Sequence, residues 1–166
     1  MEEQWKSIPT FPDYKVSNLG AVKNVRFDRY MTIIRNRDGL CVVGLSKKGR
    51  QHKRSLPLLV AHAFVKRDRP DFDQPIHLDG DQLNNCADNL AWRPHWFAVK
   101  YAAQFRRPPH MNTEQVIDLN TGRVYINAWQ ACLENGLLYK ELVYAMLNRA
   151  PVFPSYHQFR FYSGEF

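Results

Sequence analysis

The side chains best suited to chemistry lie in residues 76–92. A short apolar run ends at His77, and a polar turn with two aspartates, the first of them Asp79, and a pair of asparagines follows it. Asn89 then opens a second apolar stretch that ends at Trp92, so the segment is expected to form two strands joined by a loop. An imidazole can act as a general base, and carboxylate and amide oxygens bind hard cations. The segment therefore has residue types suited to metal-assisted hydrolysis.

A helix-forming segment, residues 95–105, completes a strand, loop, strand, helix order. With a His at the start and an Asn in the middle, this order resembles the HNH, or ββα-metal, nuclease motif. The resemblance implies that His77 is the catalytic general base and that Asn89 braces the loop. It also implies a loop shaped by Asp79–Gly80 and Asn84–Asn85. The family cofactor would be one divalent cation, Mg²⁺ or Mn²⁺, which stabilises developing charge during phosphodiester hydrolysis.

Both cation-ligand positions depart from the HNH pattern. The ligand before the His, usually Asp or Asn, is Ile76, and the ligand in the helix, usually Asn or His, falls on Ala98. Neither side chain can bind Mg²⁺ or Mn²⁺, which take oxygen or imidazole ligands. His95 lies one helical turn before Ala98 and could share its face. A replacement metal site would use His95 with Asp79 or Asp81, and the alternative is that Asp79 only shapes the loop.

The resemblance extends over almost the whole chain. Residues 5–9 and 14–22 look like the nuclease-associated pattern W-x-x-I…Y-x-V-S-N-x-G-x-V. Residues 116–125, followed by two short predicted helices, are similar to the helix-turn-helix end of phage intron-encoded HNH homing endonucleases. A further departure is Pro57–Leu58, which stands where the family has a His-Arg pair.

Composition indicates a folded protein, because 45% of the 166 residues are hydrophobic and 13% are aromatic. No run approaches the roughly 18 apolar residues that cross a bilayer, and residues 1–5 do not resemble a secretory leader. We expect a monomer without a membrane partner and a cytoplasmic location. The resemblance to phage proteins implies that the protein is phage-encoded and that the cytoplasm is that of a bacterial host cell. Three widely spaced cysteines predict neither a disulfide framework nor a zinc site.

The net charge of +7 lies in the first 60 residues, which carry 12 Lys and Arg against 5 Asp and Glu. A polyanion, double-stranded DNA in the first place, is the partner that this part predicts. The alternative is that these charges only solvate the faces of a small sheet. The candidate nucleic-acid-binding residues are Arg26, Arg29, Arg35, Arg37, Lys47, Lys48, Arg50, Lys53, Arg54, Arg106, Arg107 and Lys140.

The expected fold class is α+β, with a small N-terminal antiparallel sheet, a central ββα-metal (HNH-like) unit and a C-terminal helix-turn-helix. The expected domains are a basic strand-rich nuclease-associated module over residues 1–56, an HNH-like ββα module over 57–105, a linker over 106–115, and a hairpin plus helix-turn-helix module over 116–166.

In the last module, strands are expected over 116–119 and 123–126. Helices are expected over 128–134 and 138–147, with an N-cap at Asn127. The second helix either reads DNA or serves packing and protein contact.

Two functions of different classes follow. The first is a DNA-binding protein of the HNH homing-endonuclease family, with cleavage weakened or lost because Ile76 and Ala98 occupy the ligand positions. Such a protein would need no cofactor and would be repurposed to regulate or inhibit a nucleic-acid process or a partner protein. The second is an active metal-dependent nickase that uses His77 as general base with rearranged ligands. Binding of structured RNA or a protein complex by the basic N-terminal module is a third.

Overall fold

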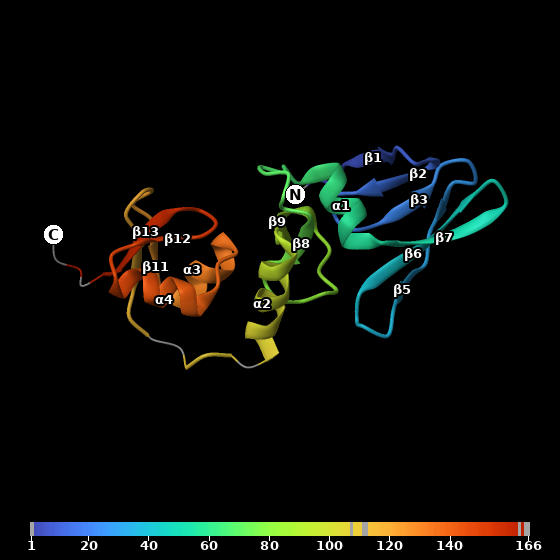
Figure 1. Ribbon diagram of the computed structural model, residues 1–166. Coiled ribbons are helices and arrows are strands. Elements are labelled where there is room, and N and C mark those ends of the chain that lie inside the picture. Colours follow the sequence, from blue (N-terminus) through green and yellow to red (C-terminus); the bar gives the residue numbers. More distant parts are fainter. Residues whose placement is uncertain (1, 107, 111–112, 163, 165–166) are drawn as a thin grey trace. The chain divides into compact units, whose positions relative to one another are not determined.

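The computed structural model describes residues 2–106, 108–110, 113–162 and 164. Its contacts divide the chain into two compact units, Met1–Ala98 and Val99–Phe166 (Figure 1). Antiparallel strands and short helices occur in both units, so the predicted α+β class is confirmed. The finer division into three modules and a linker stays a prediction. No helix in the described part of the chain is long and apolar enough to cross a membrane.

The first unit opens with two antiparallel sheets where the sequence predicted one. The first sheet has the order β1-β2-β3-β4 and consists of Trp5–Ile8, Phe11–Ser17, Val22–Asn24 and Arg29–Tyr30. The second has the order β5-β6-β7 and consists of Ile33–Arg35, Cys41–Lys47 and Arg50–Ser55. The backbone N–H of Ser46 donates to the hydroxyl of the buried Tyr14 at 3.0 Å, which joins the two sheets. A sequence pattern of alternating residues could not assign these short strands to separate sheets.

Helix α1, Leu56–Phe64, forms the centre of the first unit's core. Pro57 is tolerated because the first helical turn has no partner for its missing N–H. Leu56 and Val60 lie four residues apart on one face of the helix and are buried, as is Ala61. The helix contacts β1, β2, β6 and β7 of the two sheets and also β8 and β9, so it joins the sheets to the following hairpin (Figure 1).

The predicted strand, loop, strand, helix order is present. Strands β8, Gln74–His77, and β9, Leu90–Arg93, pair antiparallel with His77 opposite Leu90. A short 3₁₀ turn, η1 at Ala87–Asn89, precedes β9, and helix α2, His95–Arg106, follows it. The boundary between the two units falls within α2, after Ala98.

The second unit packs two helices against a four-stranded antiparallel sheet of order β11-β10-β13-β12. Its elements are β10 Val116–Asp118, β11 Val124–Tyr125, α3 Ala128–Asn135, α4 Tyr139–Leu147, β12 Pro151–Val152 and β13 His157–Phe161. The Asn127 side chain accepts from the backbone N–H of Gln130 at 2.8 Å and caps α3, as predicted, and Gly136 ends this helix at φ 59°. The two helices are confirmed, whereas DNA reading by α4 stays a prediction. The sequence analysis missed β12 and β13.

Candidate functional site

The end of β8 holds His77 in a fixed orientation. His77 is 8% exposed, and its Nε2 lies 3.0 Å from Oδ1 of Asn85. The amide nitrogen of Asn85 donates to the carbonyl oxygens of Gln82 and Leu83, each at 3.2 Å, so Oδ1 is the acceptor and Nε2 of His77 carries the proton. The lone pair of the neutral ring is then on Nδ1, which accepts no hydrogen bond from the described residues. This tautomer suits a proton acceptor.

Asn89 braces the loop between the two strands. Its amide nitrogen donates to Oδ1 of Asp79 and to the carbonyl oxygen of Asn84, both at 2.8 Å. Its Oδ1 accepts from the backbone N–H of Asp79 at 3.1 Å. The side chain therefore spans the loop from both sides, the role that the resemblance implies for it.

Asp79 uses both carboxylate oxygens inside the loop. Oδ1 also accepts from the backbone N–H of Asp81 at 2.8 Å, and Oδ2 accepts from the side-chain amide of Asn84 at 2.7 Å. Burial raises the pKa of Asp79, but the hydrogen bonds from Asn84, Asn89 and Asp81, with a smaller contribution from His77, outweigh it and hold this pKa below its usual range. The carboxylate is thus ionised at neutral pH and shapes the loop.

The turn over residues 17–21 packs directly on the segment that supports His77. The Ser17 hydroxyl accepts from the backbone N–H groups of Leu19 and Ala21, and the carbonyl oxygen of Asn18 accepts from the N–H of Ala87 at 2.8 Å. Gly20 has φ +85°, and a Cβ placed on it would lie 3.2 Å from the Cβ and carbonyl oxygen of Asn85. The S-N-x-G part of the N-terminal pattern is therefore a support for the His77 loop, a role that the sequence analysis missed.

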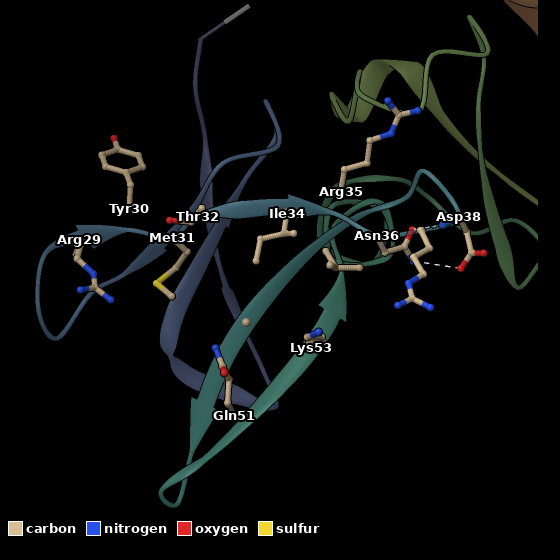
Figure 2. A pocket seen from close by; sticks show the side chains of 13 residues that line it. Arg29, Tyr30, Met31, Thr32, Ile34, Arg35, Asn36, Asp38, Gln51 and Lys53 are labelled. Atoms are coloured by element: carbon tan, nitrogen blue, oxygen red, sulfur yellow. Dashed lines mark hydrogen bonds between the residues drawn. The ribbon is translucent and has the colours of Figure 1, made fainter.

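A basic groove of roughly 1010 Å³ lies along β4, β5 and the open face of β6 and β7. Figure 2 shows Arg29 and Tyr30 at one end, Arg35 and Asp38 at the other, and Lys53 between them. Asp38 is the one carboxylate among its lining residues, which also include Arg37. No ion pair among the described residues involves the four basic side chains of this groove.

A second groove of roughly 360 Å³ lies between the first sheet and the β6–β7 turn. Its basic side chains are Arg26, Lys47 and Lys48, with Asp13 as the one carboxylate among the lining residues. The sheet geometry thus gathers seven of the predicted nucleic-acid-binding residues into two grooves of one unit. Among the other five, Arg50 and Arg54 are exposed on β7, Arg106 and Lys140 are exposed in the second unit, and Arg107 lies outside the described residues.

Known proteins are similar to this chain in sequence. The NUMOD4 motif matches residues 3–46. Two proteins of Acanthamoeba polyphaga mimivirus, both named as uncharacterized HNH endonucleases, are similar in sequence. One is 39% identical over 89 residues, which cover 54% of this chain and 22% of the relative, and the other is 30% identical over 143 residues, which cover 82% and 41%. The chain therefore spans less than half the length of either relative.

A solved structure described as DNA binding and cleavage by the HNH homing endonuclease I-HmuI has the same overall fold. The TM-score is 0.54 at 23% identity, and the match covers 98% of this chain and 99% of that chain. Strands β8 and β9 and helix α2 follow one another in the order of the HNH ββα motif, after the residues that match the NUMOD4 motif. The NUMOD4 motif, the two viral relatives and the shared fold together support an HNH homing endonuclease-like protein.

The residues present do not fit the divalent cation that this fold family implies. Ile76 is 4% exposed on β8, and Ala98 lies in the first turns of α2, so neither ligand position offers an oxygen or an imidazole. Within the described ranges, no three His, Cys, Asp or Glu residues meet in a group that could hold a metal ion. His95 is exposed at the start of α2, and its pairing with Asp79 as replacement ligands stays a prediction.

Proposed function

We propose that the protein binds double-stranded DNA through the basic grooves of its first unit and that its phosphodiester cleavage is weakened or lost. The observation that carries this proposal is the pair Ile76 and Ala98 beside a retained His77. A base can take a proton from water, but the charge that develops on the phosphate and the leaving oxygen then has no cation to stabilise it. A protein of this kind occupies DNA and regulates or inhibits a nucleic-acid process or a partner protein.

The support for DNA binding is electrostatic. Seven cationic side chains line two grooves that contain one carboxylate each, and none of the seven is ion-paired within the described residues. Phosphate contacts release condensed counterions, so affinity should fall steeply as salt concentration rises. An active nickase remains the second candidate, because His77 keeps its proton on Nε2 and its lone pair on Nδ1.

The binding test replaces Lys47, Lys48 and Arg50 together by glutamine. We expect binding to unrelated duplex sequences to weaken by about the same factor for each sequence. The slope of log affinity against log salt concentration should become less negative by about two to three. The matched control replaces Lys66, Arg67 and Arg69 by glutamine, which removes the same charge from a connection where aspartates already pair with two of the three. Equal loss of affinity in both triple variants would show that the smaller groove and the adjoining end of β7 are not the binding surface.

The cleavage test incubates the protein with supercoiled DNA and Mg²⁺ or Mn²⁺. We expect slow nicking or none. Robust nicking by the wild-type protein that disappears in His77→Ala would overturn the loss of cleavage and establish the nickase. His95→Ala would then identify whether the exposed imidazole at the start of α2 serves as a replacement ligand.

A further inference from the structure

Two aromatic rings are exposed within four residues of each other, Phe27 in the turn between β3 and β4 and Tyr30 in β4 itself. Phe27 is 71% exposed, the largest fraction for any aromatic side chain in the described residues, and Tyr30 is 62% exposed. Neither ring lies in the hydrophobic core of the first unit. Their positions therefore need an explanation other than folding.

The backbone of this segment is held in place. The buried Asn24 accepts through Oδ1 from the N–H groups of Arg26, at 3.0 Å, and Phe27, at 3.2 Å. Asp28 follows in the left-handed region at φ 49°, and its carboxylate pairs with Lys23 at 2.6 Å. These contacts fix the turn, so Phe27 projects from a defined backbone.

The ring of Tyr30 is also positioned by neighbours. The rings of Trp5 and Tyr30 are tilted by 63° in a T-shaped contact with 5.9 Å between their centroids, and Nζ of Lys23 lies 5.7 Å from the centroid of Tyr30. An exposed ring that is already ordered loses little conformational freedom when a planar ligand stacks on it.

Each ring borders one of the two basic grooves. Phe27 lines the smaller groove with Arg26, Lys47 and Lys48, while Tyr30 lines the larger one beside Arg29 (Figure 2). Basic side chains suited to binding phosphates thus lie on both sides of a short segment that exposes two aromatic rings. This alternation of phosphate sites and stacking surfaces is typical of proteins that bind single strands of nucleic acid.

We infer that the segment from Arg26 to Tyr30 binds single-stranded DNA, with one unpaired base on the ring of Phe27 and one on the ring of Tyr30. This inference rests on the proposed DNA binding and adds a single-stranded region of DNA beside the duplex that the basic grooves hold. In a duplex the base faces are covered by stacking and only the base edges are open in the grooves. The faces that match exposed rings are available only on unpaired nucleotides.

The test measures fluorescence anisotropy with two labelled strands of equal length and charge, an oligo-dT and an oligomer with abasic sites in place of the thymidines. The wild-type protein should prefer oligo-dT by at least about tenfold. Phe27→Ala with Tyr30→Ala should bind both strands alike, because the phosphate contacts remain. Phe27→Trp and Tyr30→Phe should keep the preference, because each retains an aromatic face.

A matched control comes from the second unit. Tyr156→Ala removes a ring that is 57% exposed and should leave the preference unchanged. Phe27→Leu keeps apolar bulk without an aromatic face, so it should lower the preference to the part that Tyr30 supplies while its melting temperature stays at the wild-type value. This variant separates stacking from a role of the ring in folding.

Equal affinity of the wild-type protein for the two strands, or a preference that persists in the double alanine variant, would overturn the inference. Tighter binding to oligo-U than to oligo-dT would overturn the assignment to DNA. If duplex DNA is bound with a steep salt dependence but the base preference is absent, only this inference fails. If neither duplex nor single strand is bound, the proposed function fails with it.

Discussion

Replacing Gly20 by alanine tests whether the turn over residues 17–21 supports the loop around His77. At φ +85° an alanine is disfavoured by about 1–2 kcal/mol. The added Cβ would also lie 3.2 Å from the Cβ and the carbonyl oxygen of Asn85. Making room for it in a packed region costs about 1–3 kcal/mol more. The free energy of unfolding of the first unit should therefore fall by about 2–5 kcal/mol in total.

Gly49→Ala is the matched control, because Gly49 has φ +73° and a Cβ there would meet no heavy atom within 4 Å. Its free energy of unfolding should fall only by the backbone contribution of about 1–2 kcal/mol. Urea denaturation monitored by tryptophan fluorescence measures this change. A displaced Asn85 also moves the acceptor of His77, so the ring-nitrogen NMR signals of His77 should shift in Gly20→Ala alone. Equal destabilisation by the two substitutions, with unchanged His77 signals, would refute the role of the turn.

Two further predictions concern carboxylates. Ile76→Asp with Ala98→Asn places two oxygen ligands beside His77. Since Ile76 is 4% exposed, the double variant buries a carboxylate and should have a lower melting temperature than the wild-type protein when no metal is present. Added Mn²⁺ should raise this melting temperature, and the variant should nick DNA faster than the wild-type protein. A melting temperature that does not change with Mn²⁺ would show that no metal site has formed. Asp118 has a pKa held below its usual range, because hydrogen bonds from Asn120, His157 and Thr121 outweigh the opposing effect of burial. The ionised Asp118 therefore stabilises the second unit above the unfolded-state pKa of about 4, and this stabilisation is lost as the pH falls below that value. In Asp118→Asn, the free energy of unfolding of the second unit, measured between neutral and acidic pH, should fall less with decreasing pH than in the wild-type protein.

The parts of the site that the sequence predicted are those specified by neighbouring residues. The strand that ends at His77, the returning strand and the helix from His95 follow from local apolar patterns and turn residues. The capping of α3 by Asn127 is likewise local, because the acceptor and the donated N–H are three residues apart. Such features need no knowledge of which segments meet in the folded chain.

The parts that were missed depend on contacts between distant segments. Asn85 was predicted only as a loop residue, yet it is the partner of His77, and the turn at Gly20 packs against it from another part of the chain. Strand β13 pairs Phe161 with Val116, and β12 has only two residues, so little local pattern marks either strand. Loop closure and burial decide these contacts, and a pattern within a short window does not report them.

His77 has a structural reason to remain even where cleavage is lost. His77 and Asn85 are 8% and 4% exposed, and removing one leaves the other as a buried polar group without its partner, which costs about 1–3 kcal/mol. The presence of His77 in the sequence therefore does not by itself indicate catalysis. A double-mutant cycle with His77→Ala and Asn85→Ala separates the two roles. We expect a coupling of about 1–2 kcal/mol in the free energy of unfolding, whereas additive losses would show that the hydrogen bond does not stabilise the loop. The same cycle controls the cleavage test, because His77→Ala can abolish nicking by loosening the loop, and Asn85→Ala would then abolish it as well.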